Sequence, residues 1–272
     1  SFQRAGALFA RFSAPNVAKS PGEEQTLLHM SDNPSIPYKR ILLKLSGEAL
    51  RAPGSRDNIS PEIVARIARE IAEAQKQGNL QIAVVVGGGN IWRGAKASVR
   101  GMDRATADYV GMLATVMNAL SICSAVQEAG VPCHVQSAIE MKNVAEPYVR
   151  NTARELLRKG QVIVFAAGTG NPCFSTDTGA ALRACEINAE VVLKATSVDG
   201  VYTADPKKDP TATRFDAISY QECIERNLKV MDQTAFTLCK DNHKPIMVFD
   251  MHKSGNITRA LLGERIGTII SA

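Results

Sequence analysis

The residues of this chain best suited to chemistry begin with a lysine beside a Ser-Gly turn. Lys44 lies near the end of the apolar run 40–45 and is followed at once by Ser46-Gly47-Glu48. A lysine at the end of a buried strand must face an anion, because burying an unpaired charge is costly. The Ser-Gly turn beside it leaves backbone N–H groups available, so this stretch is a candidate phosphate site. A lysine simply exposed at a strand end fits this segment equally well.

Two glycine-rich loops have a similar character. Gly87-Gly88-Gly89 follows the apolar run 82–86, and glycines at a strand end let a ligand approach the backbone closely. The second loop lies in the stretch 161–184, where a β-branched run at 162–165 is followed by a Gly/Asn/Pro loop and then by a helical pattern after Asp177. Strand, polar loop and helix N-terminus together present N–H groups and hydroxyls to an anion. Each loop alone also fits an ordinary turn, and the P-loop motif is absent from the chain.

The elements that would position these loops alternate in type along the chain. Apolar runs at 40–45, 82–86, 132–136, 162–165 and 190–194 predict strands, and the patterns at 60–78, 103–129 and 147–159 predict the intervening helices. Such alternation predicts a parallel sheet covered on both faces, with ligands outside the carboxyl ends of the strands. Lys44 and both glycine loops fall at such ends, so we predict that they form one site. A strand at 246–249, a short helix from 256 and a strand near 268–270 complete the α/β fold.

Composition narrows the class of protein. The chain has 272 residues, of which 45% are hydrophobic and 22% charged, as in soluble globular proteins, and no apolar run approaches the roughly 18 residues of a membrane span. We therefore expect no membrane partner. The net charge of +5 suits an anionic ligand but is low for a dedicated nucleic-acid binder. The six cysteines form no C-x-x-C pair and the four histidines are scattered, so we expect reduced thiols and no protein metal site.

The first 37 residues differ from the rest of the chain. Residues 1–22 contain Arg4, Arg11 and Lys19 but no acidic residue, which is typical of an organellar transit peptide, and 23–37 has the character of a linker. A tail without a targeting role is the alternative. We therefore divide the chain into an N-terminal extension, 1–37, and a single globular domain, 38–272.

Six stretches of this domain resemble the bacterial-type uridylate kinases of the amino acid kinase family. They are KLSGE at 44–48, VGGGNIWR at 86–93, DRATADYVGMLATVMN at 103–118, GTGNPCFSTD at 168–177, LKATSVDGVYTADP at 193–206 and KVMD at 229–232. The resemblance covers roughly 39–271 and is most similar to the cyanobacterial and plastid branch. It implies a three-layer α/β/α sandwich around a mainly parallel sheet, often assembled as a homohexamer. With the N-terminal extension it implies a plastid stroma location, the alternatives being a bacterial cytoplasm or a mitochondrion.

The reaction that the resemblance implies is transfer of the γ-phosphoryl group of ATP to UMP, with Mg²⁺ accompanying ATP. It assigns to ATP the residues Lys44, Ser46, Gly47, Gly89, Arg93, Thr196, Tyr202 and Asp205. It assigns to UMP the residues Gly88, Asp108, Thr169, Gly170, Asn171, Pro172, Cys173, Phe174, Ser175 and Thr176. It assigns catalysis to Lys44, Arg93, Asp177 and Asp232, the two aspartates as organisers of the lysine or the metal. The phosphate of UMP is already an anionic nucleophile, so positioning and electrostatics suffice and no general base is needed.

Two departures from the family pattern matter. Cys173 precedes Phe174 where relatives have aromatic residues after the proline, and Ser175 replaces a common threonine, which bears on uridine affinity. The segment 51–58, RAPGSRDN, lacks the Gly-Phe-Gly run tied to GTP activation, so we do not expect that response to carry over. Two alternatives stay open at this point: a kinase of the same family for another acceptor, such as carbamate, and a uridine-nucleotide or RNA-binding protein with reduced catalysis. RNA is also a candidate secondary partner of an active enzyme.

Overall fold

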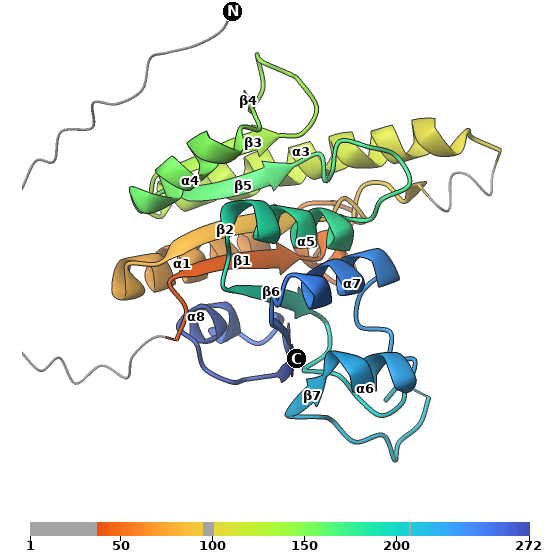
Figure 1. Cartoon of the computed structure of the whole chain (residues 1–272). Helices are drawn as coiled ribbons and strands as arrows, with labels where there is room; N and C mark the ends of the chain where they lie inside the picture. Colours follow the sequence, from red (N-terminus) through yellow and green to blue (C-terminus); the bar gives the residue numbers. More distant parts are fainter. Residues whose placement is uncertain (1–36, 95–100, 207) are drawn as a thin grey trace, which may run out of the picture. The chain divides into compact units, whose positions relative to one another are not determined.

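A computed structural model of the chain describes residues 37–94, 101–206 and 208–272 (Figure 1). The predicted N-terminal extension therefore lies almost wholly outside the described residues. The strands are β1 (Arg40–Leu45), β2 (Gln81–Val86), β3 (Cys133–Ser137), β4 (Glu146–Pro147), β5 (Val162–Ala166), β6 (Val191–Thr196), β7 (Ala217–Ser219), β8 (Ile246–Asp250) and β9 (Thr268–Ser271). The helices are η1 (Gly47–Leu50, a 3₁₀ turn), α1 (Pro61–Gly78), α3 (Arg104–Glu128), α4 (Arg150–Arg158), α5 (Thr176–Ile187), α6 (Tyr220–Glu225), α7 (Gln233–Asp241) and α8 (Asn256–Leu261).

The described strands form one sheet in the order β4-β3-β5-β2-β1-β6-β8-β9-β7. Neighbouring strands pair in parallel except for β8 and β9, which pair antiparallel. The strands that carry the predicted site, β1, β2, β5 and β6, lie side by side near the middle of the sheet. Their loops therefore emerge at one edge, as the alternating pattern predicted.

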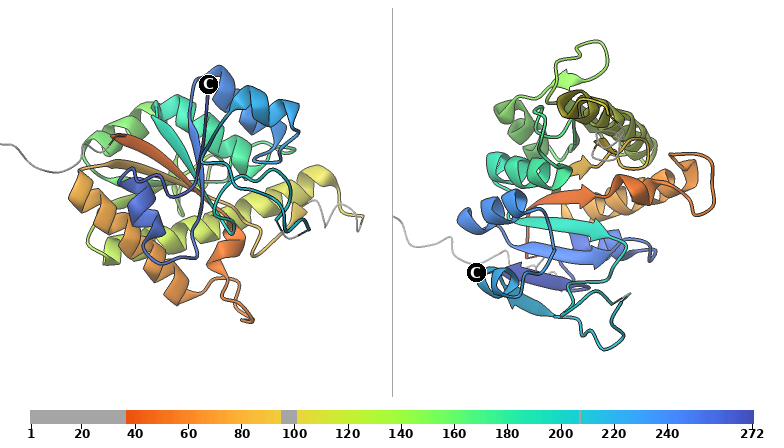
Figure 2. Two further views of the ribbon diagram at one scale, coloured as in Figure 1. Left: turned by 90° about the horizontal axis from the view of Figure 1, so that it is seen from below. Right: turned by 90° about the vertical axis from the view of Figure 1, so that its right-hand side faces the viewer.

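Helices cover both faces of the sheet, which confirms the predicted three-layer α/β/α sandwich (Figure 2). Along β1, Ile41, Leu43 and Leu45 pack in the core beneath α1, α3 and α8, whereas Leu42 packs in the opposite core beneath α4, α5 and α7. This alternation is the two-residue period of a strand buried on both faces. The same burial explains why the central strands are almost uninterrupted apolar runs.

The helix ends follow from local sequence. Ser60 caps α1 by accepting a hydrogen bond from the N–H of Ile63 at 3.4 Å, and Asn79 ends that helix in the left-handed conformation. Asp103 caps α3 in the same way through the N–H of Thr106, at 2.9 Å. The predicted central helices and strands agree with these bounds to within a few residues. The short elements β4, β7 and α6 were not predicted, because two to six residues carry too little periodicity.

Helix α3 corrects one expectation from composition. Among the described helices, it is long and apolar enough, by length and mean hydropathy, to cross a membrane. Half of its most apolar window is buried inside the structure. On the outer side of α3, four large apolar side chains are exposed at helical spacing. They are Tyr109, Leu113, Met117 and Leu120.

Candidate active site

The loops after β1 and β2 touch one another through their glycines. A Cβ atom on Gly47 would lie 2.3 Å from the carbonyl oxygen of Gly87, so no other residue fits at position 47 without displacing the backbone. Gly88 is similarly confined, because its Cβ would lie 2.8 Å from the carbonyl oxygen of Gly111 on α3. These glycines bring two strand ends and a helix together at the site. The predicted glycine motifs therefore have a packing role whatever they bind.

The glycine loop after β2 is fixed to α3 by a pair of buried asparagines. Asn118 donates to the Gly87 carbonyl at 2.7 Å and to Oδ1 of Asn90 at 2.8 Å, and Asn90 donates back to Oδ1 of Asn118 at 3.0 Å. Both amides are buried, so these hydrogen bonds replace lost water and are costly to break. They hold the backbone of the glycine loop in place before any ligand arrives.

At the centre of the site, one carboxylate contacts two lysines. Oδ1 of Asp177, at the start of α5, lies 2.7 Å from Nζ of Lys44, and Oδ2 lies 2.5 Å from Nζ of Lys194. All three side chains are 11–15% exposed. Two cations share one anion, so this cluster carries an excess positive charge that points to an anionic ligand.

The pKa values of this cluster reflect that imbalance. Burial raises the pKa of Asp177, but its two lysines outweigh burial and hold that pKa below its ordinary value. Burial lowers the pKa of Lys194, and the charge of Lys44 lowers it further, against the opposing effect of Asp177. A phosphate group placed between the lysines would supply the missing negative charge.

The loop after β5 has an unusual backbone. Ala167, Gly168, Gly170 and Cys173 all have positive φ, from 57° to 80°, and Ala167 and Cys173 adopt it without being glycine. The N–H of Ala167 donates to Oγ1 of Thr115 on α3 at 2.8 Å, which fixes the first of these turns. Strain that the surrounding structure imposes at a loop is common at ligand sites.

Asp108 holds the other end of this loop. Its Oδ2 accepts from the backbone N–H of Cys173 at 2.8 Å and from Nε of Arg104 at 2.8 Å. The Asp108 side chain is 13% exposed and still lines the cavity described below. Asp108 therefore joins α3 to the loop after β5, in addition to the ligand contact that the sequence predicted.

Arg183 supports the same loop from beneath. This buried guanidinium lies 3.8 Å from the centre of the Tyr148 ring and 2.5 Å from Oε2 of Glu186. It also donates to the Gly168 carbonyl at 3.4 Å. Nothing in the sequence marks Arg183, because its position inside an apolar helix pattern carries no motif.

Asp232 occupies a different position from Asp177. It caps α7 through the N–H of Ala235 at 3.0 Å and accepts hydrogen bonds from the hydroxyls of Ser175 and Thr178 on α5. It thus ties together the N-terminal ends of α5 and α7. Of the two predicted organising aspartates, Asp177 is the one in contact with the lysines.

One cavity, of about 400 Å³, opens between the glycine loop, α3 and the loop after β5. Of the residues assigned to UMP, it is lined by Gly88, Asp108, Thr169, Asn171, Phe174, Ser175 and Thr176. Gly89 and Arg93, assigned to ATP, also line it, as does Glu48, whose carboxylate pairs with Arg93. Gly170, Pro172 and Cys173 belong to the same loop without lining this cavity. We refer to it as the acceptor cavity.

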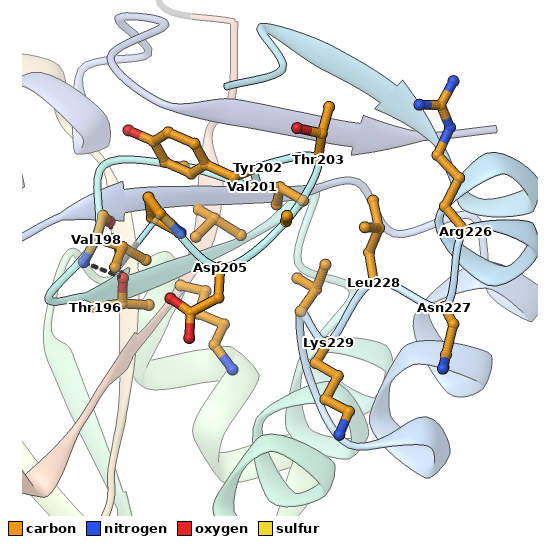
Figure 3. Close-up of a pocket in the computed structure, with 16 residues that line it drawn as sticks. Thr196, Val198, Val201, Tyr202, Thr203, Asp205, Arg226, Asn227, Leu228 and Lys229 are labelled. Atoms are coloured by element: carbon orange, nitrogen blue, oxygen red, sulfur yellow. Dashed lines mark hydrogen bonds between the residues drawn. The ribbon is translucent and has the colours of Figure 1, made fainter. Parts of the chain in front are cut away.

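Two further cavities meet at β6. The first, of about 460 Å³, is lined by Thr196, Tyr202 and Asp205 and by the segment 226–230 (Figure 3). The second, of about 770 Å³, is lined by Lys44, Ser46 and the segment 51–56. Lys194 and Thr196 line both cavities, and we refer to the two together as the donor site, after the residues that the resemblance assigns to ATP. Gly47, also assigned to ATP, lines neither cavity and packs on Gly87.

Figure 3 shows how the first of these cavities is arranged. Val201, Tyr202 and Thr203 lie along one wall, and Leu228 and Lys229 come from a separate segment that faces them. Thr196 accepts from the N–H of Val198 at 3.0 Å, which fixes the turn at the end of β6. A cavity lined by a mixture of apolar side chains, an aromatic ring and polar groups suits a nucleoside.

Lys194 is the main residue of the candidate site that no sequence motif revealed. It belonged to the predicted strand 190–194, and it is the register partner of Lys44 on the neighbouring strand. The signal was present, because Lys194 is a second charged residue at the end of an apolar run. Only the pairing of β1 with β6 shows that the two lysines meet.

The described residues contain no group of three or more His, Cys, Asp or Glu side chains placed to hold a metal ion. All six cysteines are free thiols, as expected. A divalent ion brought by a polyphosphate needs no such cage, because Mg²⁺ keeps several waters and binds phosphates together with one or two carboxylates. Glu48, which lines both the acceptor and donor cavities, is an exposed carboxylate of that kind.

Comparison with known proteins establishes the class. Residues 39–250 match the model of the amino acid kinase family, and the chain belongs to that family. It is a kinase with the three-layer α/β/α fold described above. Among solved structures it is similar to the UMP kinase of Bacillus anthracis, at 37% identity and a TM-score of 0.82, covering 86% of this chain and 96% of that one.

Two other solved structures extend the likeness. The UMP kinase of Ureaplasma parvum is 36% identical with a TM-score of 0.82, covering 86% of this chain and 99% of that one. The uridylate kinase of Archaeoglobus fulgidus is 32% identical with a TM-score of 0.65, covering 85% of this chain and 99% of that one.

Proposed function

We propose that this protein transfers the γ-phosphoryl group of ATP to UMP, giving ADP and UDP. The observation that carries the proposal is the Lys44–Asp177–Lys194 cluster, whose two lysines line the donor site, together with Glu48, which lines both the donor site and the acceptor cavity. The two cavities therefore meet at the η1 turn, where a phosphoryl group would pass from one nucleotide to the other. The UMP kinases among the similar structures support UMP as the acceptor.

The chain's residues would promote the transfer by position and charge. Lys44 and Lys194 would draw the triphosphate to the strand ends and offset charge on the transferred group, and Arg93 would face both phosphates from the glycine loop. Asp177 would keep the ammonium groups aimed at the phosphate. The oxygen of UMP that attacks is already ionised at neutral pH, so the reaction needs no general base.

The acceptor cavity favours a nucleoside monophosphate over a smaller acceptor. Its volume of about 400 Å³ and its Asp108 and Phe174 walls suit a ribose and a base, which carbamate lacks. Mg²⁺ would arrive with ATP, held by its phosphates, with Glu48 as the carboxylate nearest in the cavity lining. Its chemistry there would be to neutralise charge on the β- and γ-phosphates.

The test is a coupled ADP-release assay with UMP, CMP, dUMP and carbamate as acceptors, each with and without GTP. Strong and selective turnover of UMP is the expected result. Equal turnover of carbamate would assign the enzyme to another branch of the family. No turnover with any acceptor would favour the nucleotide- or RNA-binding alternative, which titration with uridine-rich RNA would then measure. The GTP arm reports whether the altered segment 51–58 still permits activation.

We also propose that the protein self-associates through α3. Tyr109, Leu113, Met117 and Leu120 repeat at three- and four-residue spacing and are 38–53% exposed, so they form a single apolar stripe on that helix. A second copy of the chain, offering the same stripe, is the partner that such a self-complementary surface fits. The hexamer implied by the resemblance would contain this contact.

A further inference from the structure

A third cavity lies next to the donor site and has no role in the proposed reaction. It has a volume of about 460 Å³, and Val198, Tyr202 and Pro206 line both it and the first donor cavity. The segment 197–206 is therefore a wall between the two. The remaining lining comes from the segment before β7, the β8–α8 loop, α8 and the loop that leads to β9.

The lining of this cavity is strongly basic. Four cationic residues from four different segments line it, against two acidic ones. The cations are Arg214, Lys253, Arg259 and Arg265, and the acids are Asp199 and Asp250. Oδ1 of Asp250 accepts from the N–H of His252 at 2.9 Å, which leaves its charge in place, so the lining carries an excess of two positive charges.

These cations are only partly neutralised. Arg259 pairs with Glu264 at 2.7 Å, but Arg214 is 3.4 Å from Asp199 and 3.3 Å from Asp216, which are long contacts for a guanidinium. Within the described part of the chain, no ion pair involves Lys253 or Arg265. The cavity therefore gathers positive charge with several hydrogen-bond donors still available.

We propose that this cavity binds a small polyanion with two or more adjacent phosphate groups, and that binding there loosens the wall of the donor site. Cations that converge from separate segments onto one cavity match an extended anion better than a single phosphate. Arginine supplies planar, paired donors suited to phosphate oxygens. The binding step stands independently of the proposed function, whereas its effect on the donor site rests on the assignment of ATP to that site.

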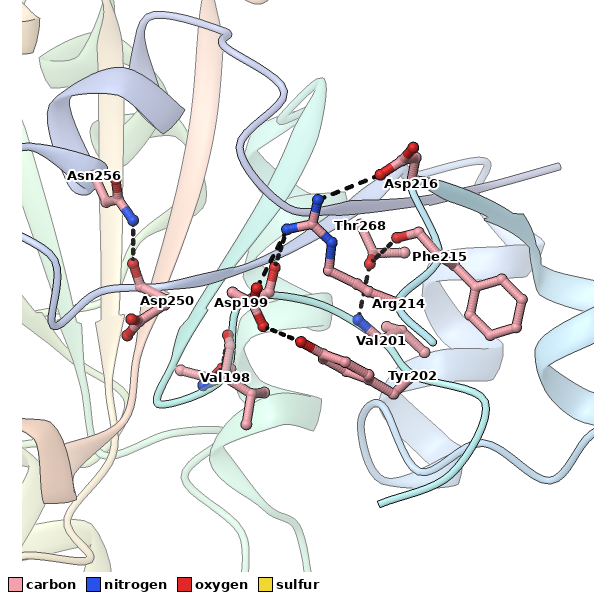
Figure 4. Close-up of polar contacts among 11 residues, drawn as sticks. Val198, Asp199, Val201, Tyr202, Arg214, Phe215, Asp216, Asp250, Asn256 and Thr268 are labelled. Carbon is pink, nitrogen blue, oxygen red and sulfur yellow. Dashed lines mark hydrogen bonds and ion pairs between the residues drawn. The ribbon is translucent and has the colours of Figure 1, made fainter. Parts of the chain in front are cut away.

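The coupling runs through Asp199 (Figure 4). Oδ1 of Asp199 accepts a hydrogen bond from the Tyr202 hydroxyl at 2.7 Å, and Oδ2 faces Arg214. Arg214 also donates to the backbone carbonyl of Asp199 at 3.3 Å. A polyanion that binds Arg214 would draw it away from Asp199. Asp199 would then no longer be held in place to accept the hydrogen bond from Tyr202, which lines the donor site.

Binding is tested by calorimetric titration of the full chain with inorganic tripolyphosphate, with orthophosphate as the single-phosphate comparison. Because tripolyphosphate also suits the donor lysines, the Lys44→Ala variant is used to weaken that competing site. We expect binding to persist in Lys44→Ala and to weaken by about tenfold or more when Lys253→Gln and Arg265→Gln are added. The control pair, Arg69→Gln with Lys159→Gln, removes the same charge from exposed residues outside these cavities and should leave binding unchanged.

Loss of binding in Lys44→Ala alone, or equal binding in the Lys253→Gln/Arg265→Gln background, would overturn the proposal. The coupling has its own readout in the active enzyme. Tripolyphosphate in the donor site competes with ATP and raises its KM linearly, and occupation of the third cavity should add a second rise that saturates. That saturating component should disappear in Lys253→Gln/Arg265→Gln, and a purely linear rise in the wild type would refute the coupling. Inactivity towards UMP would leave the binding result intact, so the two failures are distinguishable.

Discussion

Lys44 and Lys194 are register partners on the adjacent parallel strands β1 and β6, and both ammonium groups contact the same carboxylate. Side chains at paired positions of neighbouring strands point to the same face of a sheet. Two lysines placed so would repel one another, and Asp177 at the start of α5 offsets that repulsion. The two lysines and one aspartate together carry a net charge of +1, which suits a polyphosphate ligand.

Replacing Asp177 with asparagine should therefore impair both stability and turnover. The amide keeps the shape of the side chain but leaves two buried lysines without an anion. We expect the free energy of unfolding at neutral pH to fall by about 3 kcal/mol, and kcat to fall on the order of a hundredfold. Urea denaturation and steady-state kinetics measure the two effects. Added ATP should raise the melting temperature of Asp177→Asn more than that of the wild type, because phosphate replaces the lost charge.

The pH dependence of that stability difference has a defined sign. The folded-state pKa of Asp177 is held below the ordinary value of 3.8, so its contribution is complete above that value. It is lost as pH falls from 3.8 through the lower folded-state pKa, where the carboxyl becomes protonated. The difference in unfolding free energy between wild type and Asp177→Asn should shrink over that range. A difference that stays constant there would show that the lysine contacts do not stabilise the fold.

Lys194 should set the alkaline limit of activity. Its pKa lies below the ordinary value of 10.5 because the group is buried and faces Lys44. The ammonium form is the one that binds phosphate, so kcat/KM for ATP should fall as pH rises through that lowered pKa. At pH values below this folded-state pKa, Lys194 is charged in both the folded and the unfolded chain. Between the folded-state pKa and 10.5, the unfolded chain binds more protons than the folded chain, so the free energy of unfolding rises with pH.

The variant Lys194→Arg provides the control, because a guanidinium stays protonated throughout this range. Its alkaline limb should move to higher pH even if its overall rate is lower. The limb of kcat, which reports the complex with ATP, should also lie above that of kcat/KM, because the bound triphosphate favours the ammonium form. Identical limbs in the wild type and Lys194→Arg would remove Lys194 as the titrating group.

Asp108 should govern affinity for the acceptor. It lines the acceptor cavity and fixes the N–H of Cys173, so Asp108→Ala loses a contact with the ribose and also loosens the loop after β5. We expect the KM for UMP to rise by about tenfold or more, because one charge-assisted hydrogen bond to the acceptor is lost. The KM for ATP should change little. Asp103→Ala, which removes the nearby α3 cap, should lower stability without that selectivity. Equal changes in both KM values would contradict the assignment of Asp108 to the acceptor.

The sequence predicted the layers and the loops of the site, but not the contacts between them. Periodicity and β-branched runs identify strands and helices because each is a local pattern, and glycine clusters mark the strand ends. The partner of Lys44 depends instead on which strands become neighbours, and β6 is distant in sequence from β1. For the same reason Arg183 and the Asn90–Asn118 pair carried no signal, since their hydrogen bonds join segments that meet only in the folded chain.

Arg183 should be a positioning residue for the acceptor loop. Arg183→Lys keeps the charge but loses both the planar stack on Tyr148 and the paired donors to Glu186 and Gly168. We expect stability to fall by about 1–2 kcal/mol and the KM for UMP to rise. Tyr148→Phe is the matched control, because it removes the hydroxyl that donates to Glu186 and keeps the ring under Arg183. If Arg183→Lys lowered stability with both KM values unchanged, Arg183 would have a structural role only.

The apolar stripe on α3 should be the surface through which the protein self-associates. Leu113 and Met117 are 51% and 53% exposed and lie one turn apart, so Leu113→Glu with Met117→Glu places two charges at the centre of the stripe. Burying those charges between two copies would cost several kcal/mol, and light scattering should show the wild-type assembly reduced to a smaller species. Ile224, 48% exposed on the distant helix α6, is the control position, where Ile224→Glu should leave the assembly intact. An unchanged mass in the double variant would remove α3 as the contact.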